Sequence, residues 1–104
     1  YITLSDVYLS LAECYYMQDD SSMAEQLLAD VVNAKSIDVS AEGTLLKIKD
    51  IRGRISLFSG TYFAFLKRTG MAQSICDIEE YQLLLPIPSQ ELHTNPSMTQ
   101  NEGY

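Results

Sequence analysis

The stretch that decides the fold is LSDVYLSLAECYYMQDDSSMAEQLLADVVNA, residues 4–34. Apolar side chains recur at helical spacing along its first half, which predicts a helix over residues 4–17 with Ser5 as its N-cap and Asp6 favourable in its first turn. The polar run 18–21 breaks the pattern, and a second helix is predicted over residues 22–34. Because the break is short, the two helices are expected to form an antiparallel hairpin over residues 1–35. The predicted inner stripes are Leu4, Tyr8, Leu11 and Tyr15 with Val7 and Ala12 beside them on the first helix, and Ala24, Leu27, Leu28 and Val31 on the second.

The chain continues with a loop and a second pair of helices. Residues 36–43, SIDVSAEG, have the Ser, Asp and Gly content of turns. A third helix is predicted over residues 44–58 and ends or kinks at Ser59-Gly60. Its apolar face consists of Leu45, Ile48, Ile51, Ile55 and Phe58. A short fourth helix over residues 61–67 is expected to direct Phe63 and Leu66 inward, with Gly70 just past its end, so that residues 44–70 form a helix pair.

The helical pattern ends near Met71. Residues 81–85 are an apolar run of strand length, but Pro86 and Pro88 remove two backbone donors, so LLLPIP is predicted to be extended and unable to join a central strand. Ser89 is the expected cap of a single helical turn. The tail HTNPSMTQNEGY has almost no capacity to form a core. Residues 71–104 are therefore predicted to be an extended closing segment, with residues 86–104 packed against the helices of a mainly α fold.

Composition limits the function classes. The 104 residues suit one small domain. All seven bases lie between Lys35 and Arg68, and the net charge of -7 argues against a nucleic-acid binder, which needs clustered Lys and Arg. No apolar run approaches the roughly 20 residues that span a bilayer. Cys14 and Cys76 stand 62 positions apart without a CxxC motif, and two buried or half-buried thiols are favoured over a disulfide, which stays open.

No catalytic or metal-binding constellation is found in the sequence. The single histidine, His93, has no ligand residue at metal spacing, and Glu79 and Glu80 are sequence neighbours that would not converge on one centre. We therefore predict no enzyme activity, no metal and no cofactor. Sugar binding needs aromatic platforms, and there is no Trp. Spacing places Tyr8 and Tyr15 in the core. Tyr16, Tyr62 and Tyr81 are candidates for exposure, although a half-buried structural place is favoured for each, and no ligand-binding residue is assigned.

The predicted hairpin resembles one tetratricopeptide unit. Ala12, Tyr15 and Ala24 match its small-aromatic-small spacing, although Gln18 replaces the usual Gly of the turn. No second unit follows at the period of roughly 34 residues. An ordinary helical hairpin accounts for the same residues.

Three segments, in order, resemble the SusD-like (RagB/SusD) family. Residues 84–104 are similar over 21 positions to its closing motif, LPIP..E...NP...QN.GY, and residues 7–33 resemble its tetratricopeptide-like hairpin. Between them, the chain resembles the family's helix pair, ER..EL...G.R..DL.R, at Arg52, Arg54, Gly60, Phe63 and Leu66-Lys67-Arg68. It departs from that pattern at Ile51, Ile55, Ser59, Tyr62 and Phe65, where the family has acids or arginines that are expected to form internal ion pairs.

The resemblance implies a fold and a function. SusD-like proteins are lipid-anchored surface proteins of the outer membrane of Bacteroidetes-type bacteria, where they bind glycans or other nutrients and cover a TonB-dependent (SusC-like) transporter. The family is several times longer than this chain, which would therefore be a C-terminal portion whose partners include an N-terminal part of the same protein. The alternative is a generic helical module that binds a peptide.

Overall fold

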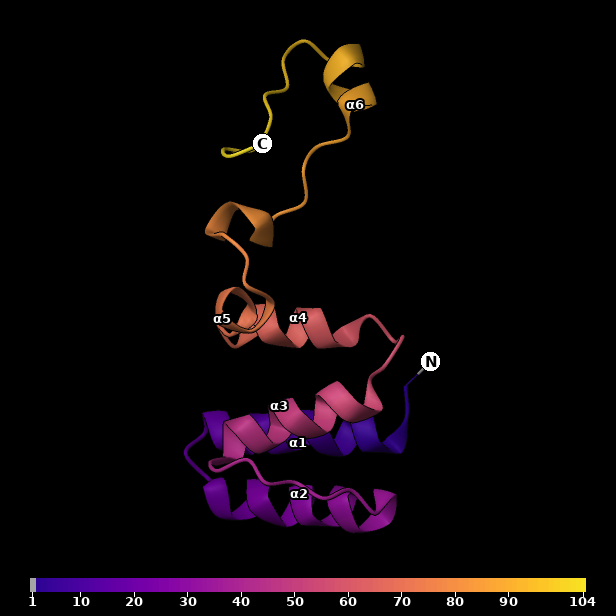
Figure 1. Cartoon of the computed structure of the whole chain (residues 1–104), viewed down its shortest axis with the longest axis vertical. Helices are drawn as coiled ribbons and strands as arrows, with labels where there is room; N and C mark the ends of the chain where they lie inside the picture. Colours follow the sequence, from indigo (N-terminus) through magenta and orange to yellow (C-terminus); the bar gives the residue numbers. More distant parts are fainter. Residues whose placement is uncertain (1) are drawn as a thin grey trace. The chain divides into compact units, whose positions relative to one another are not determined.

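The computed structural model describes residues 2–104, and within that range the chain is helical with no β-strand (Figure 1), which confirms the mainly α fold. The chain divides into two compact units between Tyr62 and Phe63, within α4. The elements are α1 (Leu4–Met17), α2 (Ser21–Lys35), α3 (Thr44–Ile55), α4 (Thr61–Arg68), α5 (Ala72–Cys76), the 3₁₀-helix η1 (Glu80–Leu83) and α6 (Ser89–Thr94). None of the described helices is long and apolar enough to cross a membrane.

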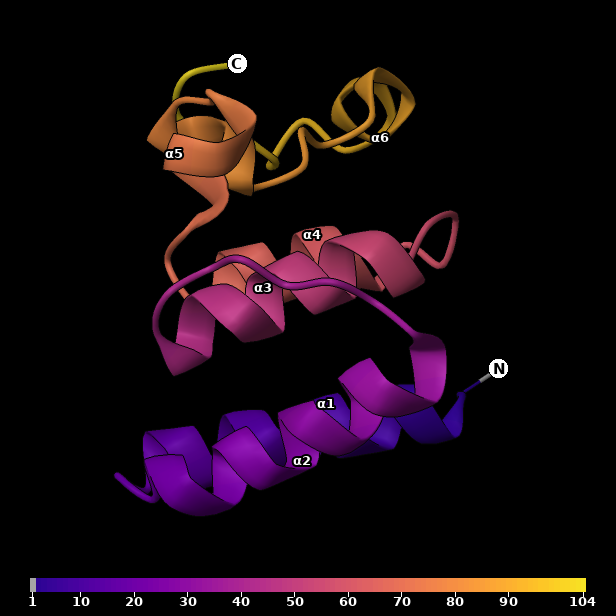
Figure 2. The ribbon, with the colours of Figure 1, turned by 60° about the horizontal axis from the view of Figure 1, so that its bottom comes forward.

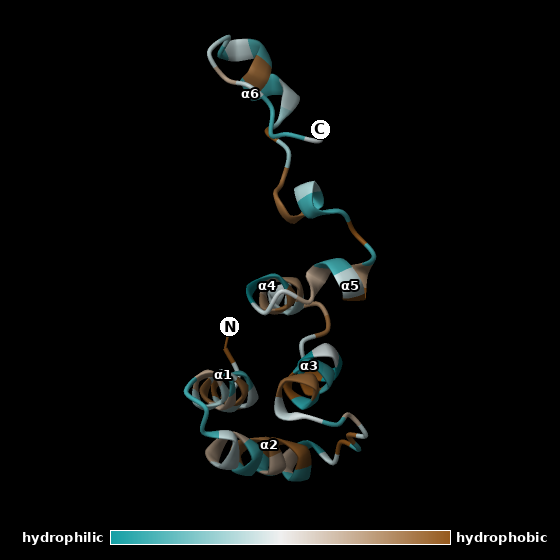
Figure 3. Cartoon of the chain, turned by 90° about the vertical axis from the view of Figure 1, so that its left-hand side faces the viewer, coloured by the Kyte–Doolittle hydropathy of each residue, from teal (hydrophilic) through white to brown (hydrophobic). Residues whose placement is uncertain are grey.

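The first unit is a three-helix bundle. α1 and α2 run antiparallel as the predicted hairpin, and α3 packs against both (Figure 2). The helices carry the hydrophobic stretches of this unit (Figure 3). Its buried apolar residues are Leu9 and Ala12 from α1, Ala24, Leu28 and Val31 from α2, and Ile48 and Ile51 from α3.

The start of α1 is fixed by a capping box. The Thr3 hydroxyl accepts a hydrogen bond from the Asp6 N–H at 3.2 Å, while the Asp6 carboxylate accepts from the Thr3 N–H at 3.0 Å and from the Thr3 hydroxyl at 2.6 Å. The predicted cap, Ser5, is wrong because it lies inside the first turn. Asp20 caps α2 in a similar way, accepting from the Met23 N–H at 3.1 Å.

The inner face of α1 differs from the predicted stripe. Leu4, Val7 and Leu11 are exposed, whereas Leu9, Ala12 and Glu13 are buried. Small residues take part in the core on both helices, since Ala12 of α1 and Ala24 of α2 are both fully buried. Glu13 belongs to this face because its charge has a partner there, as described below. The inner face of α1 that hydrophobic periodicity predicts is therefore rotated about the helix axis from the face that is buried.

The turn after α3 also corrects the prediction. α3 ends at Ile55, and Phe58 leaves the predicted apolar face with a left-handed φ of 63° and a fully exposed side chain. In α4 the buried residues are Phe65 and Leu66, so the inward assignment holds for Leu66 and is wrong for Phe63. Gly70 lies just past α4 with φ 72°, as predicted.

The second unit contains more helix than predicted. Residues 71–104 include α5, η1 and α6, and the apolar run at 81–85 is partly 3₁₀-helical, not a strand. Of the predicted extended stretch LLLPIP, Leu83 belongs to η1, whereas residues 85–88 are free of helix and strand and Leu84 has extended backbone angles. The residue before α6 is Pro88, with no side-chain cap, so the predicted cap at Ser89 is wrong. The packing of residues 86–104 against the helices stays a prediction.

Candidate functional site

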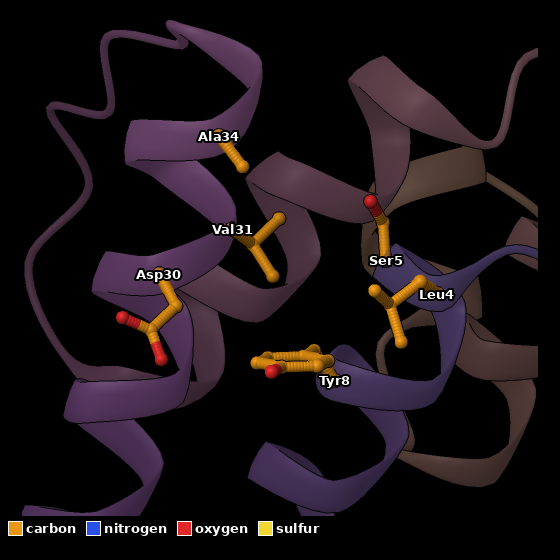
Figure 4. Close-up of a pocket in the computed structure, with 6 residues that line it drawn as sticks. All are labelled: Leu4, Ser5, Tyr8, Asp30, Val31 and Ala34. Atoms are coloured by element: carbon orange, nitrogen blue, oxygen red, sulfur yellow. The ribbon is translucent and has the colours of Figure 1, made fainter.

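A pocket of about 240 Å³ opens between α1 and α2 on the first unit (Figure 4). In Figure 4 the Tyr8 ring reaches from α1 toward the facing residues of α2. We call this cavity between α1 and α2 the Tyr8–Asp30 pocket. It is lined by Leu4, Ser5, Tyr8, Asp30, Val31 and Ala34.

Local sequence positions these side chains. The Thr3–Asp6 capping box fixes the first turn of α1, which carries Ser5 and leads to Tyr8 one turn after Leu4. On α2, Asp30 and Ala34 are four residues apart and therefore share a face. The packing of α1 against α2 brings the two walls of the pocket together.

The polar groups of the pocket are all neutral or anionic. Asp30 is exposed and makes no salt bridge with any residue in the range 2–104. The first 34 residues contain six acids and no base. Next to the pocket, hydrogen bonds from the Thr3 side chain and backbone lower the pKa of Asp6 below its ordinary value of 3.8. The site is thus a half-buried aromatic ring and two hydroxyl groups beside a carboxylate.

A second pocket, of about 270 Å³, lies between α2, the loop after it and α3. Its walls are aliphatic apart from the polar side chains Glu25, Asp38 and Lys47, and it has no aromatic residue. The Glu25 carboxylate accepts from the Lys47 ammonium at 2.7 Å and from the Thr44 hydroxyl at 2.9 Å. The Lys47 bond is the main reason that the pKa of Glu25 falls below its ordinary value of 4.5, against an opposing effect of burial. With its one cation already paired and no stacking surface, this pocket is the weaker candidate.

A buried ion pair joins α3 to α1. The Arg52 guanidinium lies 3.4 Å from the Glu13 carboxylate and donates to the Ser10 hydroxyl at 3.1 Å. Both charged side chains are less than 10% exposed. Arg52 is one of the residues that carries the resemblance in the middle segment, and it serves here to hold the bundle together.

The closing segment forms a clasp, which we define as Gln100, Asn101 and Tyr104 bonded to the backbone of residues 84–87. The Gln100 carboxamide accepts from the Ile87 N–H at 2.8 Å and donates to the Ile87 carbonyl at 3.0 Å. The Asn101 amide donates to the Leu85 carbonyl at 2.8 Å, and the Tyr104 hydroxyl donates to the Leu84 carbonyl at 2.7 Å. This polar tail is therefore ordered by its own side chains.

Two further residues close the clasp. The rings of Tyr81 and Tyr104 meet edge to face, with centroids 5.1 Å apart and an angle of 83° between their planes. Gly103 has φ 96°, and a Cβ there would lie 2.7 Å from the Tyr81 Cβ and 2.8 Å from its Cδ2. Only glycine fits both the backbone angle and the space.

The other residues considered in the sequence analysis do not form a common site in the structure. Within residues 2–104, no group of three or more His, Cys, Asp or Glu side chains is arranged to hold a metal ion. His93, Glu79 and Glu80 are exposed. Cys14 and Cys76 are exposed free thiols, so the expectation of buried or half-buried thiols is wrong and no disulfide joins them.

Two of the tyrosines are less buried than predicted, since Tyr8 and Tyr15 are half-buried and not in the core. Tyr16 and Tyr62 are half-buried, which agrees with the favoured prediction. Tyr81 is exposed but packs in the clasp. Of these residues only Tyr8 lines a described pocket together with a carboxylate. The sequence does not single out Asp30 as a site residue. The one sequence feature that places it on the pocket wall is its spacing of four residues from Ala34 on α2.

Comparison with protein families, curated proteins and solved structures finds no significant match to this chain.

Proposed function

We propose that this chain is a C-terminal portion of a SusD-like protein that captures a glycan or another nutrient at the cell surface without catalysing a reaction. In this proposal it works with a TonB-dependent outer-membrane transporter, and an N-terminal part of the same protein carries the lipid anchor. The proposal includes no cofactor and no nucleic-acid partner.

The observation that carries the proposal is the clasp. Leu84, Leu85 and Ile87 supply its backbone groups, and Gln100, Asn101 and Tyr104 supply the side chains that bond to them. These are residues through which the tail resembles the family's closing motif. A motif whose members bond to one another has a physical reason to occur as a unit, because each bond that is lost leaves a backbone group without its partner.

The Tyr8–Asp30 pocket supplies a place for the ligand. A sugar presents an apolar C–H face and a rim of hydroxyl groups, so it suits an aromatic ring next to hydrogen-bonding side chains. Tyr8 offers the ring, and Asp30 and Ser5 offer a carboxylate and a hydroxyl on the same pocket.

A glycan array on the complete gene product tests this function, together with co-purification of the product from its native membrane. We expect saccharide binding and the recovery of a TonB-dependent transporter encoded beside it. A complete 104-residue reading frame with its own start codon and no neighbouring transporter gene would overturn the proposal.

A second candidate is a helical interaction module. α1 carries the exposed apolar residues Leu4, Val7 and Leu11, which are 72%, 50% and 44% exposed and stand at the 3-4 spacing of a helix-packing seam; Leu4 also lines the pocket. A peptide bound on this seam would protect the α1 amides from exchange, whereas a sugar in the pocket would shift only the residues around Tyr8 and Asp30.

A further inference from the structure

We propose that the Tyr8–Asp30 pocket prefers a protonated amino sugar, as the end residue of a glycan, over neutral and acidic sugars. This inference rests on the proposed function and adds to it the charge of the ligand.

The carboxylate is the first reason. Asp30 makes no salt bridge within residues 2–104, and the lining residues include no Lys, Arg or His. A hydroxyl group and an ammonium group can both donate a hydrogen bond to this ionised carboxylate. The ammonium group adds the attraction between opposite charges, of which an exposed pair retains only a part.

The aromatic ring acts in the same direction. The negative face of a tyrosine ring attracts a cation, and its apolar surface accepts the C–H face of a sugar. Tyr8 and Asp30 line the same pocket from opposite helices (Figure 4). The Asp30 carboxylate is drawn turned away from the ring, but it is exposed and can rotate toward an amine bound beside Tyr8. A uronic acid would place its charge next to the same carboxylate and would be repelled.

Size limits the ligand to one ring. The pocket of about 240 Å³ is smaller than the roughly 300–1,000 Å³ of pockets that enclose drug-sized ligands. Leu4, Val31 and Ala34 form apolar walls for the C–H face, and the Ser5 and Tyr8 hydroxyl groups are available to the sugar hydroxyls. The rest of a longer glycan would extend into solvent.

Titrations of the 104-residue chain in mildly acidic, low-salt buffer test the preference, with glucosamine, glucose, glucuronate and cyclohexylamine as probes and the amide NMR signals around Tyr8 and Asp30 as the readout. We expect glucosamine to bind up to about fivefold more tightly than glucose, and glucuronate to bind most weakly. High salt should reduce the affinity for glucosamine and leave that for glucose unchanged. Cyclohexylamine, which has the charge but no hydroxyl groups, should bind more weakly than glucosamine.

Asp30→Asn should abolish the preference, so that glucosamine binds no more tightly than glucose in this variant, because the ammonium group loses its counter-charge. Asp19→Asn is the matched control, because Asp19 is an exposed acid outside the pocket and Asn tolerates its left-handed φ of 61°. The inference would be overturned if glucose and glucosamine bound equally tightly, or if cyclohexylamine bound as tightly as glucosamine. It would also be overturned if Asp30→Asn kept the preference for glucosamine.

If the complete gene product binds glycans and this chain binds no amino sugar, the inference falls and the proposed function stands. If the complete product binds no glycan, the proposed function falls whatever this chain binds.

Discussion

The carboxamide of Gln100 pairs with both backbone groups of Ile87, accepting from its N–H at 2.8 Å and donating to its carbonyl at 3.0 Å. This is the pairing that a neighbouring β-strand would provide, and here one side chain provides it. An extended stretch between two prolines has few other ways to satisfy its backbone, because Pro86 and Pro88 supply no N–H groups. The clasp therefore explains how a polar, Pro-containing tail is ordered.

We expect Gln100→Ala to accelerate hydrogen exchange of the Ile87 amide by about thirtyfold, because two bonds worth about 1 kcal/mol each are lost. Gln100→Glu keeps an acceptor for the Ile87 N–H but loses the donor to the carbonyl, so its effect should be smaller. Gln90→Ala is the control, since Gln90 is exposed and lies in α6, outside the clasp. Equal exchange in Gln100→Ala and Gln90→Ala would contradict the role of the clasp.

Gly103→Ala should disrupt the packing of Tyr81 on Tyr104. The added Cβ would overlap the Tyr81 side chain, and φ of 96° is strained for alanine. Nuclear Overhauser contacts between the two rings should therefore disappear. Gly70→Ala separates strain from overlap, because Gly70 has φ 72° but open space around its Cβ position. If Gly70→Ala also removes the ring contacts, overlap with Tyr81 is not the cause.

The buried pair of Glu13 and Arg52 gives a prediction for stability. Glu13→Ala should lower the free energy of unfolding of the first unit by about 3 kcal/mol, because Arg52 stays buried without its counter-charge. The double variant Glu13→Leu with Arg52→Met should recover most of this loss. The exposed pair of Arg54 and Asp50 is the control, and Arg54→Ala should change stability by less than about 0.5 kcal/mol. Urea unfolding followed by circular dichroism measures all three, and an equal loss in the single and double variants would argue against an electrostatic cause.

The pKa of Glu25 predicts a dependence of stability on pH. Because this pKa is lowered in the folded state, mainly by Lys47, the stabilising contribution is present above the ordinary value of 4.5 and is lost as the pH falls through the folded pKa. Its size is below about 1 kcal/mol, since both partners are about one-third exposed. Lys47→Met should raise the Glu25 pKa, measured by NMR titration of its carboxyl group, and should flatten the acid limb of the stability curve. An unchanged Glu25 titration in this variant would rule out Lys47 as the cause.

The hairpin could be predicted from sequence, but its inner face could not. Apolar spacing located both helices to within a residue or so. The inside of α1 includes Leu9, Ala12 and the buried Glu13, whose partner Arg52 lies 39 positions away. A single helical pattern contains no information on that distant partner, so the more hydrophobic side, with Leu4 and Leu11, was taken for the core.

Only part of the candidate site could be predicted from the sequence. Tyr8 was considered as an aromatic platform and assigned to the core, because its place on the apolar stripe outweighed its polar hydroxyl. Asp30 was not singled out, since the sequence does not say which side of α2 faces the start of α1. In the tail, the resemblance pointed to Gln100 and Tyr104, but bonds that span 13 and 20 residues follow from the fold. The short helices α5 and η1 have too few turns to show a period.

Phe58 provides a last prediction, because it combines a left-handed φ of 63° with a fully exposed ring. A bulky side chain in this conformation costs about 1 kcal/mol, and no burial offsets that strain. Phe58→Asn should therefore raise the free energy of unfolding of the first unit by about 1 kcal/mol, since Asn tolerates left-handed angles. Phe58→Gly should raise it less, because glycine also increases the entropy of the unfolded chain. Leu57→Asn is the matched control, as Leu57 is 69% exposed without a positive φ. A loss of stability in Phe58→Asn, measured by urea unfolding, would show that the ring makes a stabilising contact in solution.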